Sequence, residues 1–173
     1  MLGGYRRRGT LGIVMLVVLA GVVVLRADGD EGAGGVEMKA AQDAQVVHVT
    51  DGDTVEVLLD GRTEDVRYIG IDTPEVDPSI GVECFGHQAS ELNARLVGGR
   101  RVRLVFDDEL RDRYGRLLAY VYVGKLLVNA EIVRRGYART LTIPPNTDRA
   151  ALFARLERDA GRAGSGLWSH CPA

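Results

Sequence analysis

Five side chains in the middle of the chain have the types and order needed for phosphodiester chemistry: Asp53, Arg67, Asp72, Glu75 and Arg116. Two carboxylates can hold a hard cation, because Ca²⁺ and similar ions prefer oxygen ligands. Two guanidiniums can grip a phosphate through paired hydrogen bonds, and they stay charged at any physiological pH. The remaining acid, Glu75, is then available to act on a water molecule.

Each acidic motif also has an ordinary structural interpretation. Asp51-Gly52-Asp53-Thr54 is typical of a tight turn between two strands. The segment from Asp72 to Glu75 could begin a helix, with Thr73 as its cap. A proline at position 78 would break such a helix, so we expect Glu75 on a loop without a structural task.

The ordinary alternative for Arg67 and Arg116 is a surface role, because most arginines are solvated or form ion pairs that stabilise a protein little. Arg67 lies inside a strand pattern that starts at Val66, which fixes the direction of its side chain. Arg116 stands at the expected start of a later strand. These positions favour phosphate binding. Three further arginines are interpreted as surface charge: Arg100, Arg101 and Arg103.

From Gln45 onward, the apolar pattern predicts strands first and helices later. Five strands are expected, near residues 46–49, 55–59, 66–72, 102–106 and 117–123. Helices are expected near residues 87–97, 128–135 and 148–163. Five short strands with a helix between the third and fourth indicate a small OB-fold barrel, so the predicted class is α+β and mainly β.

The N-terminus has the pattern of a targeting segment. Arg6-Arg7-Arg8 precede an apolar stretch from Leu11 to Leu25, which suits a signal sequence better than a spanning helix. We expect residues 1–27 to form a signal peptide or an uncleaved signal-anchor helix, residues 28–42 a flexible spacer, and residues 43–173 one folded domain. The basic cluster favours a cytoplasmic N-terminus, so the domain is expected outside the cytoplasm, secreted or held at the membrane by this single helix.

The two cysteines, Cys84 and Cys171, gain meaning from the expected export. An oxidising compartment allows them to pair, and the bridge would tie the C-terminus to the middle of the domain. Closing a loop of this length stabilises a protein by about 4 to 5 kcal/mol in the loop-entropy model. The alternative is a zinc site that adds His87 or His170. It is weaker because no Cys-x-x-Cys or His-x-x-x-His spacing is present.

The charge balance argues against a broad nucleic-acid-binding surface. The chain has 22 basic and 24 acidic residues, and its net charge is −2. The first 36 residues hold four arginines and three acids, so the remainder carries −3. Proteins that bind nucleic acid through many phosphate contacts are usually basic. The balance favours a catalyst that holds its substrate briefly at a local site.

From about Gln45 to Ser169, the chain resembles the staphylococcal-type thermonuclease family. The resemblance rests on motifs in the family's order: Asp-Gly-Asp-Thr at 51–54, Asp-Thr-Pro-Glu at 72–75, Glu-Cys-Phe-Gly at 83–86, Asp-Arg-Tyr-Gly-Arg at 112–116 and Gly-Leu-Trp at 166–168. It implies an OB-fold, calcium-dependent nuclease that acts on DNA and RNA. It assigns Asp53, Asp72 and the carbonyl of Thr73 to Ca²⁺. Arg67, Glu75 and Arg116 are assigned to catalysis.

The same resemblance places Tyr114 and the neighbouring Arg113 at the substrate, where Tyr114 is expected to pack against the nucleotide. A second aromatic residue, which the family's best-known member presents before its last helix, is replaced here by Thr142-Ile143-Pro144-Pro145. Because a stacked base contributes about 1 to 3 kcal/mol, we expect weaker substrate binding on that side and unchanged chemistry.

Two functions of different classes follow from these observations. The first is an exported or membrane-anchored nuclease that works as a monomer. The second is a non-catalytic extracytoplasmic OB module that binds nucleic acid or another ligand, since folds of this kind host many functions. The complete catalytic set favours the nuclease. Hydrolysis of another phosphodiester would use the same residues.

Overall fold

The structure is a computed structural model that describes residues 40–171 except 78 and 80. The expected leader at residues 1–27 and nearly all of the expected spacer lie outside the described residues, as does the proline at position 78. Within the described part of the chain, no helix has the length and apolar content that a membrane crossing requires.

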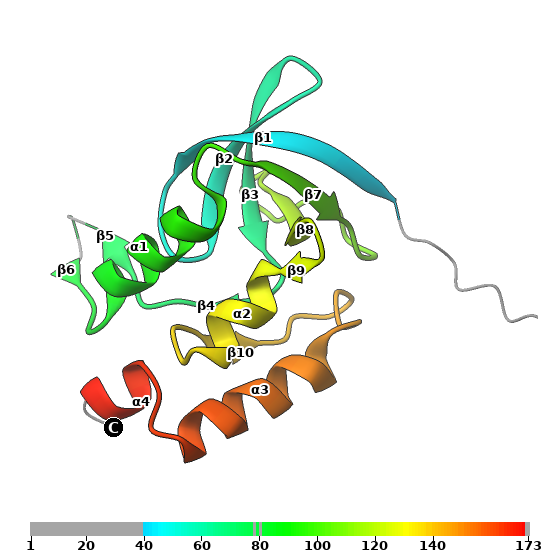
Figure 1. The fold of residues 1–173 in the computed structure, drawn as a ribbon. Coiled ribbons are helices and arrows are strands. Elements are labelled where there is room, and N and C mark those ends of the chain that lie inside the picture. The colour runs from blue at the N-terminus through cyan, green and yellow to red at the C-terminus, as the bar shows by residue number, and fades with distance from the viewer. Residues whose placement is uncertain (1–39, 78, 80, 172–173) are drawn as a thin grey trace, which may run out of the picture. The chain divides into compact units, whose positions relative to one another are not determined.

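Five strands close into a barrel, which Figure 1 shows from the side. They are β1 (Ala41–Val49), β2 (Thr54–Leu59), β3 (Arg62–Tyr68), β7 (Arg101–Val105) and β8 (Leu117–Val123). Antiparallel pairing joins β3 to β2, β2 to β1, β1 to β7 and β7 to β8. The parallel pairing of β3 with β8 then closes the sheet. Closure removes the free edges of the sheet, and the predicted five-stranded OB-type barrel is confirmed.

Strand β1 contributes to both halves of the barrel. Its first residues pair with β7, where Ala41 lies opposite Val105, and its last residues pair with β2, where Val49 lies opposite Val55. The register shifts between Val46 and His48, and such a bulge bends a strand. The strand begins at Ala41, before the expected domain start at residue 43, because its first residues extend the ladder with β7.

Two Asp-Gly turns connect strands of the barrel, and the first of them is the turn expected from the sequence. The Asp51-Gly52 turn joins β1 to β2, and the N–H of Thr50 donates to the carbonyl of Thr54 over 3.1 Å. The Asp60-Gly61 turn joins β2 to β3, with φ angles of +49° and +80°. Asp and Gly suit this turn because they tolerate the left-handed conformation better than other residues.

The three expected helices are present: α1 (Gly86–Val97), α2 (Val128–Arg134) and α3 (Ala150–Arg162). A single further turn, α4 (Leu167–His170), ends the described chain. Short strands complete the connections: β4 (Gly70–Asp72) with β10 (Arg139–Leu141), β5 (Val76–Asp77) with β6 (Gly81–Val82), and β9 (Leu126–Leu127) beside β8. Figure 1 shows α2 between the barrel and α3, and α2 contacts both.

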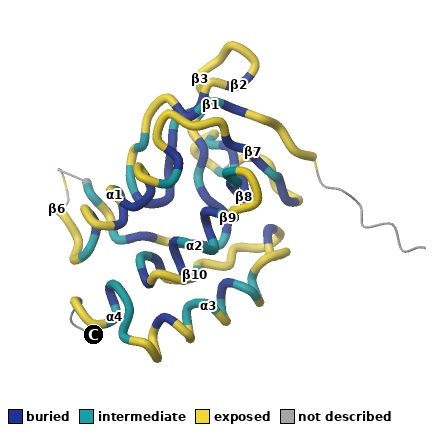
Figure 2. The backbone as a smooth tube through the Cα atoms, in the orientation of Figure 1, coloured by how far each residue is buried: buried dark blue, intermediate teal, exposed yellow. Residues whose placement is uncertain are grey.

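The core fills the barrel and the space beneath the helices, as the buried segments in Figure 2 show. Val55 and Val57 of β2 are 0% exposed, as is Leu104 of β7. Each fully buried side chain of this kind stabilises the fold by about 1.5 to 3 kcal/mol. In α3, Phe153 and Ala160 are buried, so this face of the helix points into the domain.

The two cysteines form a disulfide in the structure. The bond joins Cys84, just before α1, to Cys171, just after α4, across a sequence separation of 87 residues. Neither cysteine is free, so the zinc alternative loses both of its thiol ligands. The pairing predicted from the sequence is present.

Candidate active site

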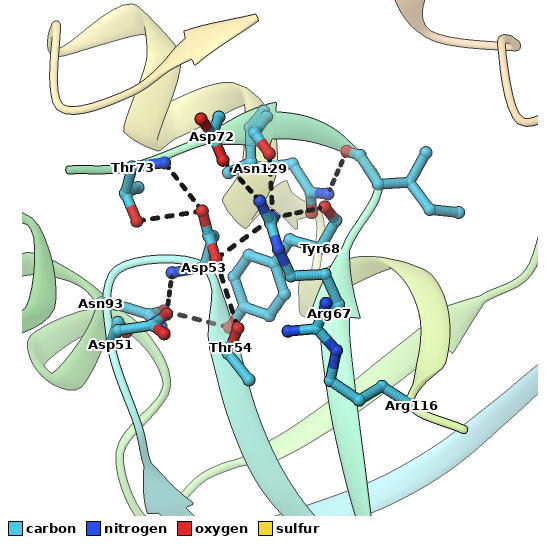
Figure 3. Close-up of polar contacts among 12 residues, drawn as sticks. Asp51, Asp53, Thr54, Arg67, Tyr68, Asp72, Thr73, Asn93, Arg116 and Asn129 are labelled. Carbon is cyan, nitrogen blue, oxygen red and sulfur yellow. Dashed lines mark hydrogen bonds and ion pairs between the residues drawn. The ribbon is translucent and has the colours of Figure 1, made fainter. Parts of the chain in front are cut away.

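Asp53 is the buried acid of the candidate site and is 4% exposed. One carboxylate oxygen accepts hydrogen bonds from the backbone N–H of Thr73 at 2.7 Å and from its hydroxyl at 2.9 Å. The other oxygen accepts from the hydroxyl of Thr54 at 3.3 Å and lies 3.1 Å from the Arg67 guanidinium. Figure 3 shows these contacts converging on Asp53. A single carboxylate therefore joins β2, β3 and the segment after β4.

Arg67 lies between two acids. It extends from β3 and its side chain is 13% exposed. Its Nη1 donates to the carbonyl oxygens of Tyr68 at 3.1 Å and Ile71 at 2.9 Å, and its Nη2 donates to Asp72 at 2.8 Å. These contacts fix the guanidinium, and the structure brings the expected residues Asp53, Arg67 and Asp72 together.

Burial controls the charge state of Asp53. Burial raises the pKa of Asp53 to about 7, and the negative charge of Asp51 adds to this effect. Arg67 and the hydrogen bonds from Thr73 act in the opposite direction but are outweighed. A buried carboxylate with an incompletely compensated charge is more stable when a cation is near.

Glu75 lies on the exposed loop between β4 and β5, outside any helix, as expected. Its N–H donates to the Glu83 carboxylate at 3.1 Å, and the N–H of Glu83 donates to the carbonyl of Glu75 at 3.0 Å. Burial raises the pKa of Glu75, and the charges of Asp51, Asp72 and Glu83 raise it further, while Arg67 lowers it. This part of the molecule therefore carries more negative than positive charge.

Arg116 is oriented by Asp112, a residue that the sequence analysis did not single out. The Nε of Arg116 donates to one Asp112 oxygen at 2.8 Å. The other oxygen accepts from the backbone N–H groups of Arg116 and Tyr114 at 3.0 and 2.9 Å. Burial acts to raise the pKa of Asp112, but these hydrogen bonds outweigh it and lower the pKa. Asp112 is thus an ionised anchor for the guanidinium of Arg116.

The closure of the barrel brings Arg116 to Arg67. Arg67 lies opposite Leu118 in the parallel pairing of β3 with β8, only two residues from Arg116. Both arginines line a cavity of about 450 Å³, and Figure 3 shows Arg116 reaching towards Arg67. Tyr114 and Arg113 line the same cavity. The expected phosphate-binding and substrate-binding residues therefore share one opening.

Tyr114 forms one wall of this cavity and is 68% exposed. The guanidinium carbons of Arg113 and Arg116 lie 4.7 and 5.6 Å from the centre of its ring. Leu141 and Ile143 also line the cavity, and both are exposed. An aromatic ring and aliphatic side chains thus border the opening, which matches the absence of a second aromatic residue noted in the sequence.

A smaller cavity of about 200 Å³ is lined by Asp72, Thr73 and Glu83. Glu75 belongs to the lining of neither cavity. The acids on this side supply only oxygen donors, which suit a hard cation such as Ca²⁺. Among the residues that the structure describes, however, no three His, Cys, Asp or Glu side chains form a ready metal cluster. The carboxylate oxygens on this side suit calcium as ligands, and the excess of negative charge around them favours a cation.

Two buried asparagines support the site, and neither was predicted from the sequence to have a role in it. Asn93 of α1 donates to the carbonyl of Asp51 at 2.8 Å and accepts from the Tyr68 hydroxyl at 3.0 Å. Asn129 of α2 accepts from the N–H of Val121 at 2.9 Å. It also donates to the carbonyl of residue 69 at 3.0 Å. In the sequence, these contacts are indicated only by an asparagine on a helix face whose other residues are apolar.

One family model and three known proteins are similar in sequence to this chain. A family model described as "Staphylococcal nuclease homologue" matches residues 65–170, which include Arg67, Asp72, Glu75 and Arg116 but not Asp53. The thermonuclease of Staphylococcus hyicus is 32% identical over 163 residues, covering 94% of this chain and 96% of that protein. The thermonuclease of Staphylococcus intermedius is 34% identical over 166 residues, covering 92% and 96%. Endonuclease YncB of Bacillus subtilis (strain 168) is 39% identical over 122 residues, covering 69% of this chain and 58% of that protein.

Proposed function

The chain belongs to the staphylococcal nuclease family, and from this premise we propose that it is a calcium-dependent nuclease that hydrolyses phosphodiester bonds of DNA and RNA. The hydrolase class is supported by the thermonucleases and endonucleases among its relatives. The observation that carries the proposal is the position of Arg67, held between Asp53 and Asp72 in the cavity that Arg116 also lines.

The scissile phosphate binds between Arg67 and Arg116. The Nε–H of Arg67 has no partner among the described residues, and only the Nε of Arg116 is engaged by Asp112. Donors therefore remain on both guanidiniums for phosphate oxygens, and a guanidinium matches phosphate geometry with paired hydrogen bonds. Tyr114 packs against the nucleotide, and Arg113 adds positive charge at the rim of the same cavity.

Glu75 takes a proton from the attacking water or orients it. Its exposed loop gives water access, and its raised pKa makes its carboxylate a stronger base near neutral pH than an ordinary glutamate. General base catalysis of this kind contributes on the order of a hundred- to ten-thousand-fold in rate. As the water attacks in line, negative charge grows on the phosphoryl oxygens. Arg67 and Arg116 are already positioned to stabilise it.

Asp53, Asp72 and the carbonyl of Thr73 would hold the calcium ion. When bound, the ion supplies positive charge that stabilises the charge developing on the phosphate. Asp53 already binds Thr73 through two hydrogen bonds, so these donors belong to one connected unit. Arg116 stabilises charge on the departing oxygen as a cation, because a guanidinium does not release its protons in proteins.

The proposal is tested by hydrolysis of single-stranded DNA and of RNA during a calcium titration, with a chelator as the zero point. We expect both substrates to be cut only with calcium. Glu75→Gln should lose about a hundred- to ten-thousand-fold in rate, with an unchanged circular dichroism spectrum. A wild-type protein that cuts neither substrate at any calcium concentration would instead support the non-catalytic binding module.

The location of the enzyme is a second part of the proposal. We propose that the basic and apolar segment before residue 28 exports the domain, which then works outside the cytoplasm as a monomer. The Cys84–Cys171 disulfide supports this, because such bonds persist mainly in oxidising compartments. Mass measurement of the protein from membrane and culture-fluid fractions distinguishes a cleaved from an anchored form. Recovery of all protein from the cytoplasm would refute export.

A further inference from the structure

The loop that carries Glu75 is closed by one residue, Glu83. The Glu83 carboxylate accepts the N–H of Glu75 at 3.1 Å, and the Glu83 N–H donates to the carbonyl of Glu75 at 3.0 Å. These two hydrogen bonds connect the ends of the excursion that contains β5 and β6. The backbone of Glu75 therefore has its position set by a side chain eight residues later.

The residue after Glu83 anchors this closure to another part of the fold. Cys84 is bonded to Cys171, and the N–H of Cys171 donates to the carbonyl of Leu167 in α4 at 3.0 Å. The N–H of Leu167 in turn donates to the carbonyl of Gly136, after α2, at 2.8 Å. Hydrogen bonds and the disulfide therefore connect the Glu75 loop to the helical part of the domain.

The packing next to the disulfide leaves little free space for the Glu75 backbone. A Cβ atom at Gly86 would lie 2.6 Å from the carbonyl oxygen of Glu75. Phe85 packs on Tyr137 with ring centres 4.8 Å apart, and on His170 at 5.4 Å. A small movement of this junction would therefore move the carbonyl of Glu75 with it.

The described part of the loop is largely exposed to solvent. Glu75, Glu83 and Cys84 are all exposed, and Val82 is 51% exposed. Segments with exposed hydrogen bonds and few buried apolar contacts open at the lowest free-energy cost. Asp53, Arg67 and Thr73, by contrast, are held by the barrel and by mutual contacts. Loss of the hydrogen bonds to Glu83, which act as a tether, should therefore displace Glu75 more than the other residues of the site.

We propose that Glu83 is a positioning residue for Glu75, and that the Cys84–Cys171 disulfide holds Glu83 in place, so that turnover depends on the oxidised state of this bond. This inference rests on the proposed role of Glu75. Loss of the tether displaces the base and leaves the phosphate-binding arginines in position, so kcat falls while KM changes little. The nuclease turns over slowly as the dithiol. It reaches its full rate after thiol–disulfide exchange with an oxidised small-molecule disulfide, which forms the Cys84–Cys171 bond and is itself reduced to two thiols.

The Glu83 part is tested by a set of three variants. Glu83→Ala should lower kcat at least tenfold and change KM less than twofold, because a displacement of about 1 Å in a catalytic group can cost a hundredfold. Glu83→Gln loses the same charge but keeps an oxygen that accepts the Glu75 N–H, so it should restore kcat to within threefold of wild type. The matched control is Glu91→Ala, which removes an exposed acid of α1 that forms an ion pair with Arg95 on the same helix; it should leave both constants unchanged.

The disulfide part is tested by reduction of the wild-type protein with dithiothreitol, followed by reoxidation. We expect kcat to fall at least fivefold and to recover. The double variant Cys84→Ser, Cys171→Ser should show the low kcat and no response to the reductant. Amide exchange measured by NMR adds a readout that needs no activity. The Glu75 N–H should lose protection on reduction and in Glu83→Ala, while the Thr73 N–H, bound to buried Asp53, should keep it.

The outcomes separate the parts of the inference. Equal kcat and equal Glu75 protection in oxidised and reduced protein overturn the role of the disulfide. Glu83→Ala keeps the disulfide, so an unchanged kcat in that variant overturns the positioning role even if the reduced protein unfolds. If the oxidised wild type cuts no nucleic acid, the proposed function fails, and the amide exchange still reports whether the tether exists.

Discussion

Asp53 shows how one residue joins structure to charge. Its carboxylate is buried, accepts three hydrogen bonds and contacts Arg67, yet burial still raises its pKa to about 7. In the folded protein this group therefore binds a proton at a pH where the unfolded chain has already released it. The residue that connects three segments of the site also makes the calcium-free fold sensitive to pH.

We expect the calcium-free protein to lose stability as the pH rises from 5 to 8. The folded pKa of Asp53 lies above its ordinary value of 3.8, so the folded state binds more protons in this range and rising pH favours the unfolded state. The free energy of unfolding should fall by no more than about 1.4 kcal/mol per pH unit. Urea titrations in chelator at four pH values measure the slope.

The control for this pH effect is Asp53→Asn, which should reduce the slope because it removes the acid with the pKa of about 7. Glu75, whose pKa is also raised, should leave a smaller slope of the same sign. Added calcium should also reduce the slope if Asp53 is a ligand. The acids whose pKa is lowered, such as Asp112 and Glu131, lose their stabilising contribution only at lower pH, below their ordinary values. A stability that rises between pH 5 and 8 in chelator would contradict the expectation.

Asp112 contributes to the site because it orients Arg116. Asp112→Ala removes the acceptor for the Nε of Arg116 and for two backbone N–H groups. We expect kcat on single-stranded DNA to fall about ten- to a hundredfold, because a misplaced cation stabilises the transition state poorly. Glu64→Ala removes a nearby ion pair with Arg111 and is the control. Similar losses in both variants would argue against the specific role of Asp112.

At the scale of elements, two loops contribute to the lining of the larger cavity. The segment after β7 carries Tyr114, and the segment after β10 carries Ile143. A reciprocal pair of hydrogen bonds connects them: the N–H of Glu109 donates to the Asn146 side chain at 2.7 Å, and that side chain donates to the carbonyl of Glu109 at 2.9 Å. Buried Asn146 therefore fixes these two lining loops to each other.

We expect Asn146→Ala to raise KM for single-stranded DNA about five- to tenfold and to change kcat less than threefold. The two lining loops separate while the arginines stay in place, and the lost hydrogen bonds lower the free energy of unfolding by about 1 to 3 kcal/mol. Steady-state kinetics and urea unfolding measure the two effects. Thr142→Ala, an exposed change in the same loop, should change neither KM nor the free energy of unfolding. If Asn146→Ala lowered kcat by as large a factor as it raised KM, Asn146 would have a role in the chemistry.

At the scale of the whole molecule, the disulfide joins the middle of the described domain to its last helical turn. The barrel closes by hydrogen bonding between strands. The helices that follow are held by packing, by side-chain hydrogen bonds such as those of Asn129, and by this covalent bond. A link between distant positions mainly restricts the unfolded chain, and the stabilisation grows with the length of the closed loop.

Reduction should therefore lower the free energy of unfolding by about 4 to 5 kcal/mol in the loop-entropy model. Domains of this size have about 5 to 15 kcal/mol in total, so we expect the reduced protein to stay folded at 25 °C but to unfold at lower urea concentration. The fluorescence of the single tryptophan, Trp168, reports the transition. The double cysteine-to-serine variant should show no effect of reductant, and an unchanged midpoint for reduced wild type would refute the expectation.

Much of the fold is determined by short-range patterns. The alternation of apolar residues predicts the barrel strands because side chains alternate faces along a strand, and apolar spacing predicts α3 because a helix repeats every 3.6 residues. The sequence also predicts the Asp51-Gly52 turn. It likewise shows which side-chain groups Arg67 and Glu75 offer for chemistry. Even the position of Arg116 at the start of β8 follows from local sequence.

What the tertiary structure decided is which distant residues meet. The parallel pairing of β3 with β8 brings Arg116 to Arg67, and no local pattern specifies that register. The contact of Asn93 with the Asp51 carbonyl and the clamp between Glu109 and Asn146 join positions 42 and 37 residues apart. Side-chain hydrogen bonds across such distances depend on the path of the whole chain, so residue types alone could not predict them. The chemistry of the site was therefore readable from the sequence, and its supporting contacts required the fold.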